Sequence, residues 1–148
     1  MTTEILTTLE STSKGAKTRK SQITQRTILD AACCLFGARG YNGTSISEIE
    51  EASGVNRGLV AYHFGTKADL WKAVVQAYFS EYIDEKKSQS DLFRALDPDT
   101  LARVTIRNFV LFSARRPHLS KIMIQENMDP SWRQDWIIEK FLLPIQET

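Results

Sequence analysis

The chain has 148 residues, of which 42% are hydrophobic, and a formal net charge of +1 at pH 7. This is enough apolar material for one core-forming domain, or for a small domain joined to part of a second. The near-neutral total excludes a uniformly basic protein, so any binding of a polyanion depends on where the charges lie.

The basic residues gather near the amino end of the chain. Residues 14–26 hold no acid and five cations, whereas residues 68–148 hold 11 cations against 12 acids. Residues 1–22 carry few large apolar side chains, so we expect a flexible basic arm there. Such an arm either attracts phosphates without regard to sequence or is simply a solvated tail.

Cys33 and Cys34 are adjacent, and neighbouring side chains on a helix point about 100° apart. They cannot readily bridge each other or clamp a metal, and we interpret them as small helix residues of a reducing cytoplasm. The amino end is polar, and no apolar run approaches the ~20 residues that span a bilayer. We therefore expect a cytoplasmic protein with no membrane partner.

Catalytic motifs are not evident in this sequence. His63 and His118 are its two histidines, and it has neither a Gly-rich phosphate loop nor a carboxylate pair at a distinctive spacing. We expect no enzyme activity, no cofactor and no metal.

Helical spacing dominates the chain, without a convincing alternating strand, and predicts an all-α fold. After Thr24, apolar residues recur at helical intervals through Phe36, and Gly40 is the expected stop of this first helix. Ser45 and Glu48 form a capping-box pattern that starts a second helix of about two turns, ended by Gly54.

A third short helix is expected to begin at Asn56, a good N-cap residue, and to bury Val60 and Phe64. Thr66 and Asp69 then form another capping pair in front of the next helix. Two short helices joined by a glycine-containing turn, after a longer packing helix, predict a helix-turn-helix over residues 23–70. Such a motif places its second helix in the major groove of DNA.

With Val60 pointing inward, about 100° per residue turns Arg57, Gly58, Ala61 and Tyr62 outward. This side of the third helix is the one expected to face the bases. Three acids, Glu48, Glu50 and Glu51, would repel phosphates if they faced DNA, so we expect them to point away.

Residues 28–74 resemble the DNA-binding domain of TetR-type transcriptional regulators. The matching positions are Ala31-Ala32, Leu35-Phe36, Gly40-Tyr41, Thr44-Ser45-Ile46, Ile49, Ala52, Gly54-Val55, Tyr62-His63-Phe64 and Lys67-Ala68-Asp69-Leu70. The resemblance implies a homodimeric, ligand-responsive repressor that binds a palindromic double-stranded DNA operator and has an all-helical C-terminal domain. Periodicity alone indicates only a helical protein with a helix-turn-helix.

The resemblance also implies individual contacts with DNA. Base edges would be read by Ser47, Arg57, Gly58, Leu59 and Ala61, and phosphates would be bound by Thr44, Ser45, Tyr62, His63 and Lys67. Arginine can pair bidentately with guanine, and a lysine at a helix N-terminus suits a phosphate.

Four of these assignments have a simpler alternative. Arg57 is otherwise an ordinary surface residue, and Lys67 an ordinary residue of a capping turn. Leu59 and His63 are otherwise core residues.

Residues 71–148 are expected to form a helical ligand-binding and dimerisation domain that looks shorter than the family pattern, so that the interface would be incomplete or built differently. A fourth helix is expected to run to about Ile83, followed by a charged hinge over residues 84–91. Asp97-Pro98 predicts the start of a fifth helix, apolar almost all round and therefore buried. With two further helices after Pro117 and Ser131, the total is about seven.

An apolar effector cavity is predicted between the last three of these helices. Its expected lining is Phe109, Phe112, Met123, Met128, Trp132 and Trp136, with Asn108, Arg107, His118 or Gln125 as polar anchors. Ordinary core packing is the alternative for each aromatic residue. For the whole chain, the alternative function is a helical ligand-binding or protein-interaction module whose helix-turn-helix is only architectural.

Overall fold

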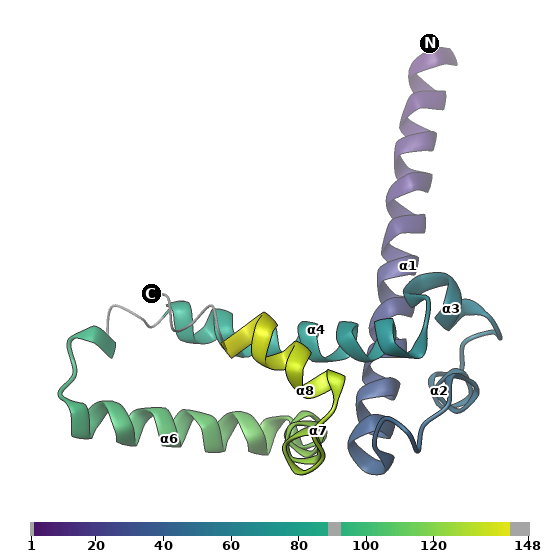
Figure 1. Ribbon diagram of the computed structural model, residues 1–148. Coiled ribbons are helices and arrows are strands. Elements are labelled where there is room, and N and C mark those ends of the chain that lie inside the picture. Colours follow the sequence, from purple (N-terminus) through teal and green to yellow (C-terminus); the bar gives the residue numbers. More distant parts are fainter. Residues whose placement is uncertain (1, 89–92, 143–148) are drawn as a thin grey trace.

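The computed structural model describes residues 2–88 and 93–142, and these residues form helices and connecting turns without a strand. The predicted all-α fold is therefore confirmed. Figure 1 shows the order of the elements, which are α1 (Thr2–Arg39), α2 (Ile46–Ser53), α3 (Leu59–Phe64), α4 (Lys67–Ser88), α6 (Pro98–Arg115), α7 (Pro117–Met128), α8 (Trp132–Ile137) and the π-helix η1 (Ile138–Leu142).

Helix α1 begins much earlier than the sequence suggested. It starts at Thr2 rather than near Thr24, and residues 2–39 contain no proline to interrupt the hydrogen-bond ladder. Its end agrees with the expectation, because Gly40 takes a φ of 75° and donates its N–H to Phe36 O at 2.8 Å. The flexibility of residues 1–22 stays a prediction.

Helix α2 has both of its expected ends. The Ser45 hydroxyl accepts from Glu48 N–H at 3.2 Å, while the Glu48 carboxylate accepts from Ser45 N–H at 2.9 Å. This reciprocal pair is the predicted capping box. Gly54, at φ 69°, closes the other end in the left-handed region.

The N-cap predicted for α3 is wrong. The cap is Gly58, with a φ of 89°, and Asn56 instead accepts a turn hydrogen bond from Leu59 N–H at 3.1 Å. An L-residue adopts such a φ only with strain, so a glycine is needed here. The turn thus extends through Gly58, and Arg57 lies before the helix rather than inside it.

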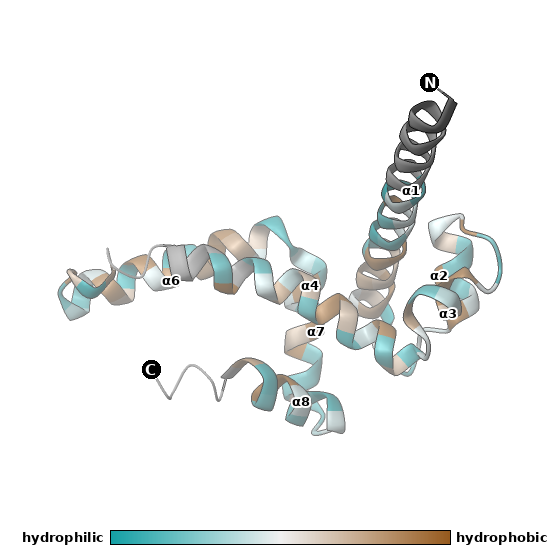
Figure 2. Cartoon of the chain, turned by 90° about the horizontal axis from the view of Figure 1, so that it is seen from above, coloured by the Kyte–Doolittle hydropathy of each residue, from teal (hydrophilic) through white to brown (hydrophobic). Residues whose placement is uncertain are grey.

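The core lies where α1 and α4 cross and where α7 packs beside them (Figure 1). Its buried side chains come from every described helix except α6: Ile28, Ala32, Cys33, Phe36, Ile49, Val60, Leu70, Trp71, Val74, Val75, Tyr78, Leu119, Ile122, Ile137 and Phe141. Viewed from above, Figure 2 shows hydrophobic residues on α1 and α4 at this crossing as well as along the other helices. The helix-turn-helix and the C-terminal helices therefore share α1 as a common support.

Helix α4 continues to Ser88, beyond the expected end near Ile83. Residues 84–88 of the predicted hinge are helical, and residues 89–91 lie outside the described part of the chain. The capping residues Thr66 and Asp69 exchange the expected hydrogen bonds at 3.1 Å, with Lys67 as the first helical residue.

The expectation that the apolar fifth helix would be buried is wrong. This helix, α6, begins after Asp97 as predicted, but it has no buried residue. Ile106 is 64% exposed and Phe109 58% exposed. The reason is its position: among the described elements α6 packs mainly against α7, so one element covers a helix that is apolar on several sides.

The last helices attach to the core through aromatic and ionic contacts. Trp132 and Trp136 of α8 both pack edge-on against Trp71 of α4. Arg133 Nε lies 2.8 Å from Glu126 Oε1 in a buried ion pair between α8 and α7. Throughout the described residues, every helix is too short or too polar to traverse a lipid bilayer.

Gly37 of α1 lets α7 approach closely. A Cβ at this position would lie 2.7 Å from the backbone oxygen of His118. We expect Gly37→Ala to lower the free energy of unfolding by about 1–3 kcal/mol, because backbone atoms on both sides would have to move. Urea unfolding followed by circular dichroism measures this. A rise of roughly 0.5–1 kcal/mol, the usual effect of alanine in a helix, would contradict it.

Candidate nucleic-acid interface

The outward side of α3 and of the turn before it is open to solvent. Arg57, Gly58 and Ala61 are exposed, Tyr62 is 81% exposed, and Val60 is completely buried. The predicted orientation of this segment is therefore confirmed. A guanidinium, a bare backbone, a methyl and a phenol form one continuous strip of the kind that base edges and phosphates contact.

A buried carboxylate holds the start of α3 against α2. Glu50 is 8% exposed, and its Oε1 accepts the N–H of Gly58 at 2.7 Å. Hydrogen bonds to an ionised acceptor are among the stronger ones in proteins. From the sequence, Glu50 was expected only to point away from DNA; in the structure it fixes the orientation of the turn that carries Arg57.

Of the other two acids of α2, Glu48 is engaged within the protein. Glu48 caps its own helix and pairs with Arg39 at 2.6 Å, which balances its charge. Hydrogen bonds from the backbone and hydroxyl of Ser45 hold the pKa of Glu48 below its ordinary value, so the cap keeps its charged form. Glu51 is exposed.

Lys67 and Thr44 anchor the turn between α1 and α2. Lys67 Nζ donates to Tyr41 O at 3.0 Å and to Thr44 O at 3.1 Å, and lies 4.3 Å from the centre of the Tyr41 ring. The Thr44 side chain is buried, and its hydroxyl donates to Gly40 O at 2.9 Å. Two of the three donors of Lys67 are thus engaged within the protein.

The remaining candidate residues surround this strip. Ser47 is exposed on α2, and Ser45 is exposed with its hydroxyl bonded to Glu48. His63 is half-buried, with Nδ1 3.4 Å from Gln25 Nε2 of α1. Leu59 is half-buried as well. These side chains lie on the same helix-turn-helix, but their individual DNA contacts stay predictions.

The predicted effector residues differ in their exposure, and their role in binding an effector stays a prediction. Phe109 and Met128 are exposed, and Trp132 and Trp136 pack on Trp71. Two pockets are found elsewhere, of about 190 Å³ beside Cys33 and about 340 Å³ beside Tyr41. Of the four suggested polar anchors, His118 borders the first pocket and Gln125 the second.

Glu50 and Lys67 owe their positions to contacts that local patterns do not reveal. Glu50 lies eight residues from its partner Gly58, across a turn, and Lys67 reaches back 26 residues to Tyr41. A signal for Glu50 exists in hindsight: it directly follows the core residue Ile49, on the side of α2 that α3 must cover.

Comparison with known proteins agrees with this geometry. Residues 28–74 match the family profile described as bacterial regulatory proteins, tetR family. The HTH-type transcriptional regulator AcrR of Shigella flexneri is 41% identical over 56 residues, which cover 38% of this chain and 26% of AcrR. The HTH-type transcriptional dual regulator CecR of the same organism is 28% identical, over 88% of this chain and 63% of its own length.

The likeness extends into the C-terminal helices. The repressor AcnR of Corynebacterium glutamicum is 28% identical over 78% of this chain and 57% of its own length. A crystal structure of a HlyIIR mutant superposes with a TM-score of 0.66 at 29% identity, covering 82% of this chain and 64% of that one. The chain thus spans less than two thirds of the length of these relatives.

The Glu50 contact is tested by its removal. Glu50→Ala leaves the Gly58 N–H without its partner, and we expect the free energy of unfolding to fall by about 1–3 kcal/mol in urea titrations. Its exposed neighbour provides the control, since Glu51→Ala should change that free energy by no more than about 0.5 kcal/mol. Equal effects of the two substitutions would show that the contact does not stabilise the fold.

Proposed function

Because the chain belongs to the TetR family of bacterial regulatory proteins, we propose that it is a sequence-specific DNA-binding regulator that represses transcription. The observation that carries the proposal is the exposed strip of Arg57, Gly58, Ala61 and Tyr62, which lies on the side of α3 opposite the buried Val60. Relatives named as transcriptional repressors support the direction of regulation.

The base contact proposed for each residue of this strip follows from the chemistry of its side chain. Arg57 is exposed and has no acidic partner among the described residues, so its guanidinium is available to guanine O6 and N7. Ala61 offers a methyl group to thymine, and Gly58 allows close approach. Ser47 and Leu59 complete the proposed base-facing set.

Phosphate contacts are proposed for Ser45, Tyr62 and His63, which lie at the edges of the strip. Thr44 and Lys67 are also proposed to contact phosphate, and in addition they position the turn between α1 and α2. The Thr44 hydroxyl and two donors of Lys67 hold this turn through hydrogen bonds to its backbone. The third Lys67 donor is left for a phosphate at the start of α4. The basic arm would add attraction that depends on salt.

Operator binding is proposed to involve two copies of the chain. One recognition helix reads only a few base pairs, whereas a dimer reads two half-sites about 34 Å apart, as a palindromic operator requires. The exposed apolar side chains of α6 supply surface that a second copy could bury. Residues 23–70 would form the DNA-binding domain, and residues 71–148 would contribute to dimerisation and to the response to a small molecule.

Regulation is proposed to follow from the connection of α4 to both parts of the chain. Helix α4 begins next to α3 and carries Trp71, against which α8 packs. An effector that prefers one arrangement of the C-terminal helices would shift α4, and with it the separation of the two recognition helices.

The DNA-binding proposal is tested by a gel shift on duplexes from the promoter that flanks the gene. Arg57→Ala should weaken binding to the preferred duplex by ~1–3 kcal/mol and relax sequence choice at one position of each half-site. Arg94→Ala is the matched control, since it removes the same charge from an exposed position outside both the helix-turn-helix and α6. Binding that ignores sequence in the parent protein, or equal losses in both variants, would contradict the proposal.

A further inference from the structure

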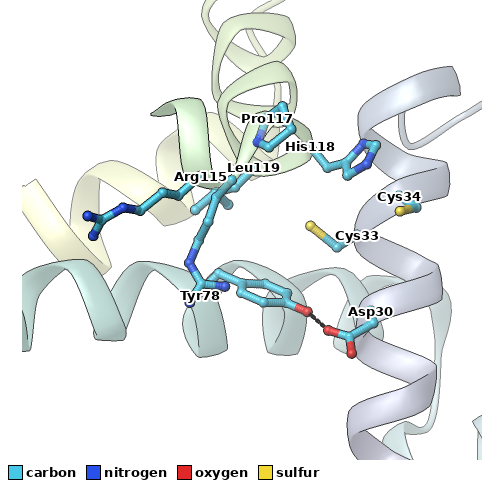
Figure 3. Close-up of a pocket in the computed structure, with 9 residues that line it drawn as sticks. Asp30, Cys33, Cys34, Tyr78, Arg115, Pro117, His118 and Leu119 are labelled. Carbon is cyan, nitrogen blue, oxygen red and sulfur yellow. Dashed lines mark hydrogen bonds between the residues drawn. The ribbon is translucent and has the colours of Figure 1, made fainter. Parts of the chain in front are cut away.

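Two tyrosines lie at the contacts between α1 and the helices that follow the helix-turn-helix. Tyr78 of α4 donates a hydrogen bond from its hydroxyl to Asp30 of α1, as Figure 3 shows. Tyr41 lies in the turn after α1, and its ring packs edge-on against Trp132 of α8, with 5.7 Å between the ring centres. The turn in front of α2 is therefore in direct contact with a C-terminal helix.

The ring of Tyr41 has a cation from each part of the chain beside it. Lys67 Nζ, at the start of α4, lies over the ring at 4.3 Å from its centre. Arg133 Cζ, from α8, lies over the ring at 4.7 Å from its centre. Both distances fall within the ~6 Å over which a cation is attracted to an aromatic face. One side chain of the turn thus contacts both the lysine proposed to bind phosphate and an arginine of the C-terminal helices.

A buried ion pair with α7 holds Arg133 in place. The side chains of Arg133 and Glu126 are only 10% and 6% exposed, and Arg133 Nε lies 2.8 Å from Glu126 Oε1. The other carboxylate oxygen of Glu126 accepts from the hydroxyl of Ser131, the N-cap residue of α8, at 3.1 Å. The position of the Arg133 guanidinium is therefore set by α7 and by the start of α8.

Lys67 depends on Tyr41 in two ways. Besides lying over the ring, its Nζ donates to the Tyr41 carbonyl at 3.0 Å, while its second acceptor is the Thr44 carbonyl at 3.1 Å. A lysine side chain has large rotamer freedom, so an ammonium group without such contacts samples many positions. Contacts that restrict Lys67 beforehand lower the entropic cost of meeting a phosphate.

We propose that Arg133 is a positioning residue for DNA binding, which acts through the Tyr41 ring on the phosphate contact of Lys67. The inference rests on the proposed function, since it takes Lys67 as a phosphate ligand. While α8 holds Arg133 against the ring, the Lys67 ammonium stays at the turn; when α8 moves away, the ring and the ammonium lose a restraint. The arrangement of the C-terminal helices thereby changes the affinity for DNA without changing which bases are read.

The salt dependence of DNA binding tests this proposal. Arg133→Met combined with Glu126→Met removes the ion pair as a whole, and replacing a buried pair by apolar residues of similar size often leaves stability unchanged. Fluorescence anisotropy of a labelled duplex should show a flatter dependence of log affinity on log salt in this pair variant. The slope should move toward that of Lys67→Met, which loses ~0.9 per subunit with its phosphate contact. The preference for the specific duplex over an unrelated one should stay that of the parent protein.

A double-mutant cycle shows whether Arg133 acts through Lys67. In the Lys67→Met background, the pair variant should change neither the affinity nor the salt slope any further. Arg115→Met with Glu139→Met is the matched control, because it removes one cation and one acid from exposed positions of the C-terminal helices. This control should keep the slope of the parent protein.

The possible outcomes separate this inference from the proposed function. A folded pair variant that keeps the parent salt slope overturns the inference and leaves the proposed function intact. The same holds for a pair variant that flattens the slope equally with and without Lys67, since Arg133 would then act by another route. A parent protein that prefers no duplex contradicts the proposed function, and the inference falls with it.

The role of the ring is tested without disturbing the ion pair. Tyr41→Leu removes the ring but retains the backbone carbonyl, and it should flatten the salt slope as the pair variant does. Tyr41→Phe retains the ring and should keep the parent slope. Equal slopes in these two variants overturn the inference, even if the pair variant does not fold.

Discussion

The hydrogen bond from Gly58 N–H to the buried Glu50 carboxylate sets the orientation of α3 relative to α2 in the helix-turn-helix. It joins α2 to the residue that starts α3, at a backbone conformation suited to glycine. With this point fixed and Val60 buried, Arg57, Ala61 and Tyr62 face outward. A carboxylate that would repel DNA if it lay at the surface is thus buried, where it holds the backbone of the exposed strip in place.

A second constraint is that α1 belongs to both parts of the molecule. Its carboxyl half packs against α2 on one side and against α4 and α7 on the others. Lys67 ties the start of α4 to the turn after α1, and Tyr78 ties the middle of α4 to Asp30. These contacts connect the C-terminal helices to the helix-turn-helix without a separate linker.

Local signals in the sequence predicted the elements better than the contacts between them. Ser45, Glu48 and Gly40 act within a few residues of one another, so their capping roles were readable from spacing. The N-cap at Gly58 was missed because its conformation depends on Glu50, eight residues away. The apolar pattern of α6 predicted burial, but periodicity does not say whether another element is present to cover a helix. The pocket beside Cys33 joins three distant segments and has no local signal.

The central claim is that the strip of Arg57, Gly58, Ala61 and Tyr62 enters a DNA groove, with Ser47 beside it, while the C-terminal helices stay clear of the DNA. Backbone NMR mapping with an operator duplex measures this directly. The claim predicts large, saturable shifts for the amides of Arg57, Gly58, Ala61 and Tyr62, and much smaller shifts along the α7 residues 117–128. Shifts centred on α7, or spread evenly over basic residues whatever the DNA sequence, would contradict it.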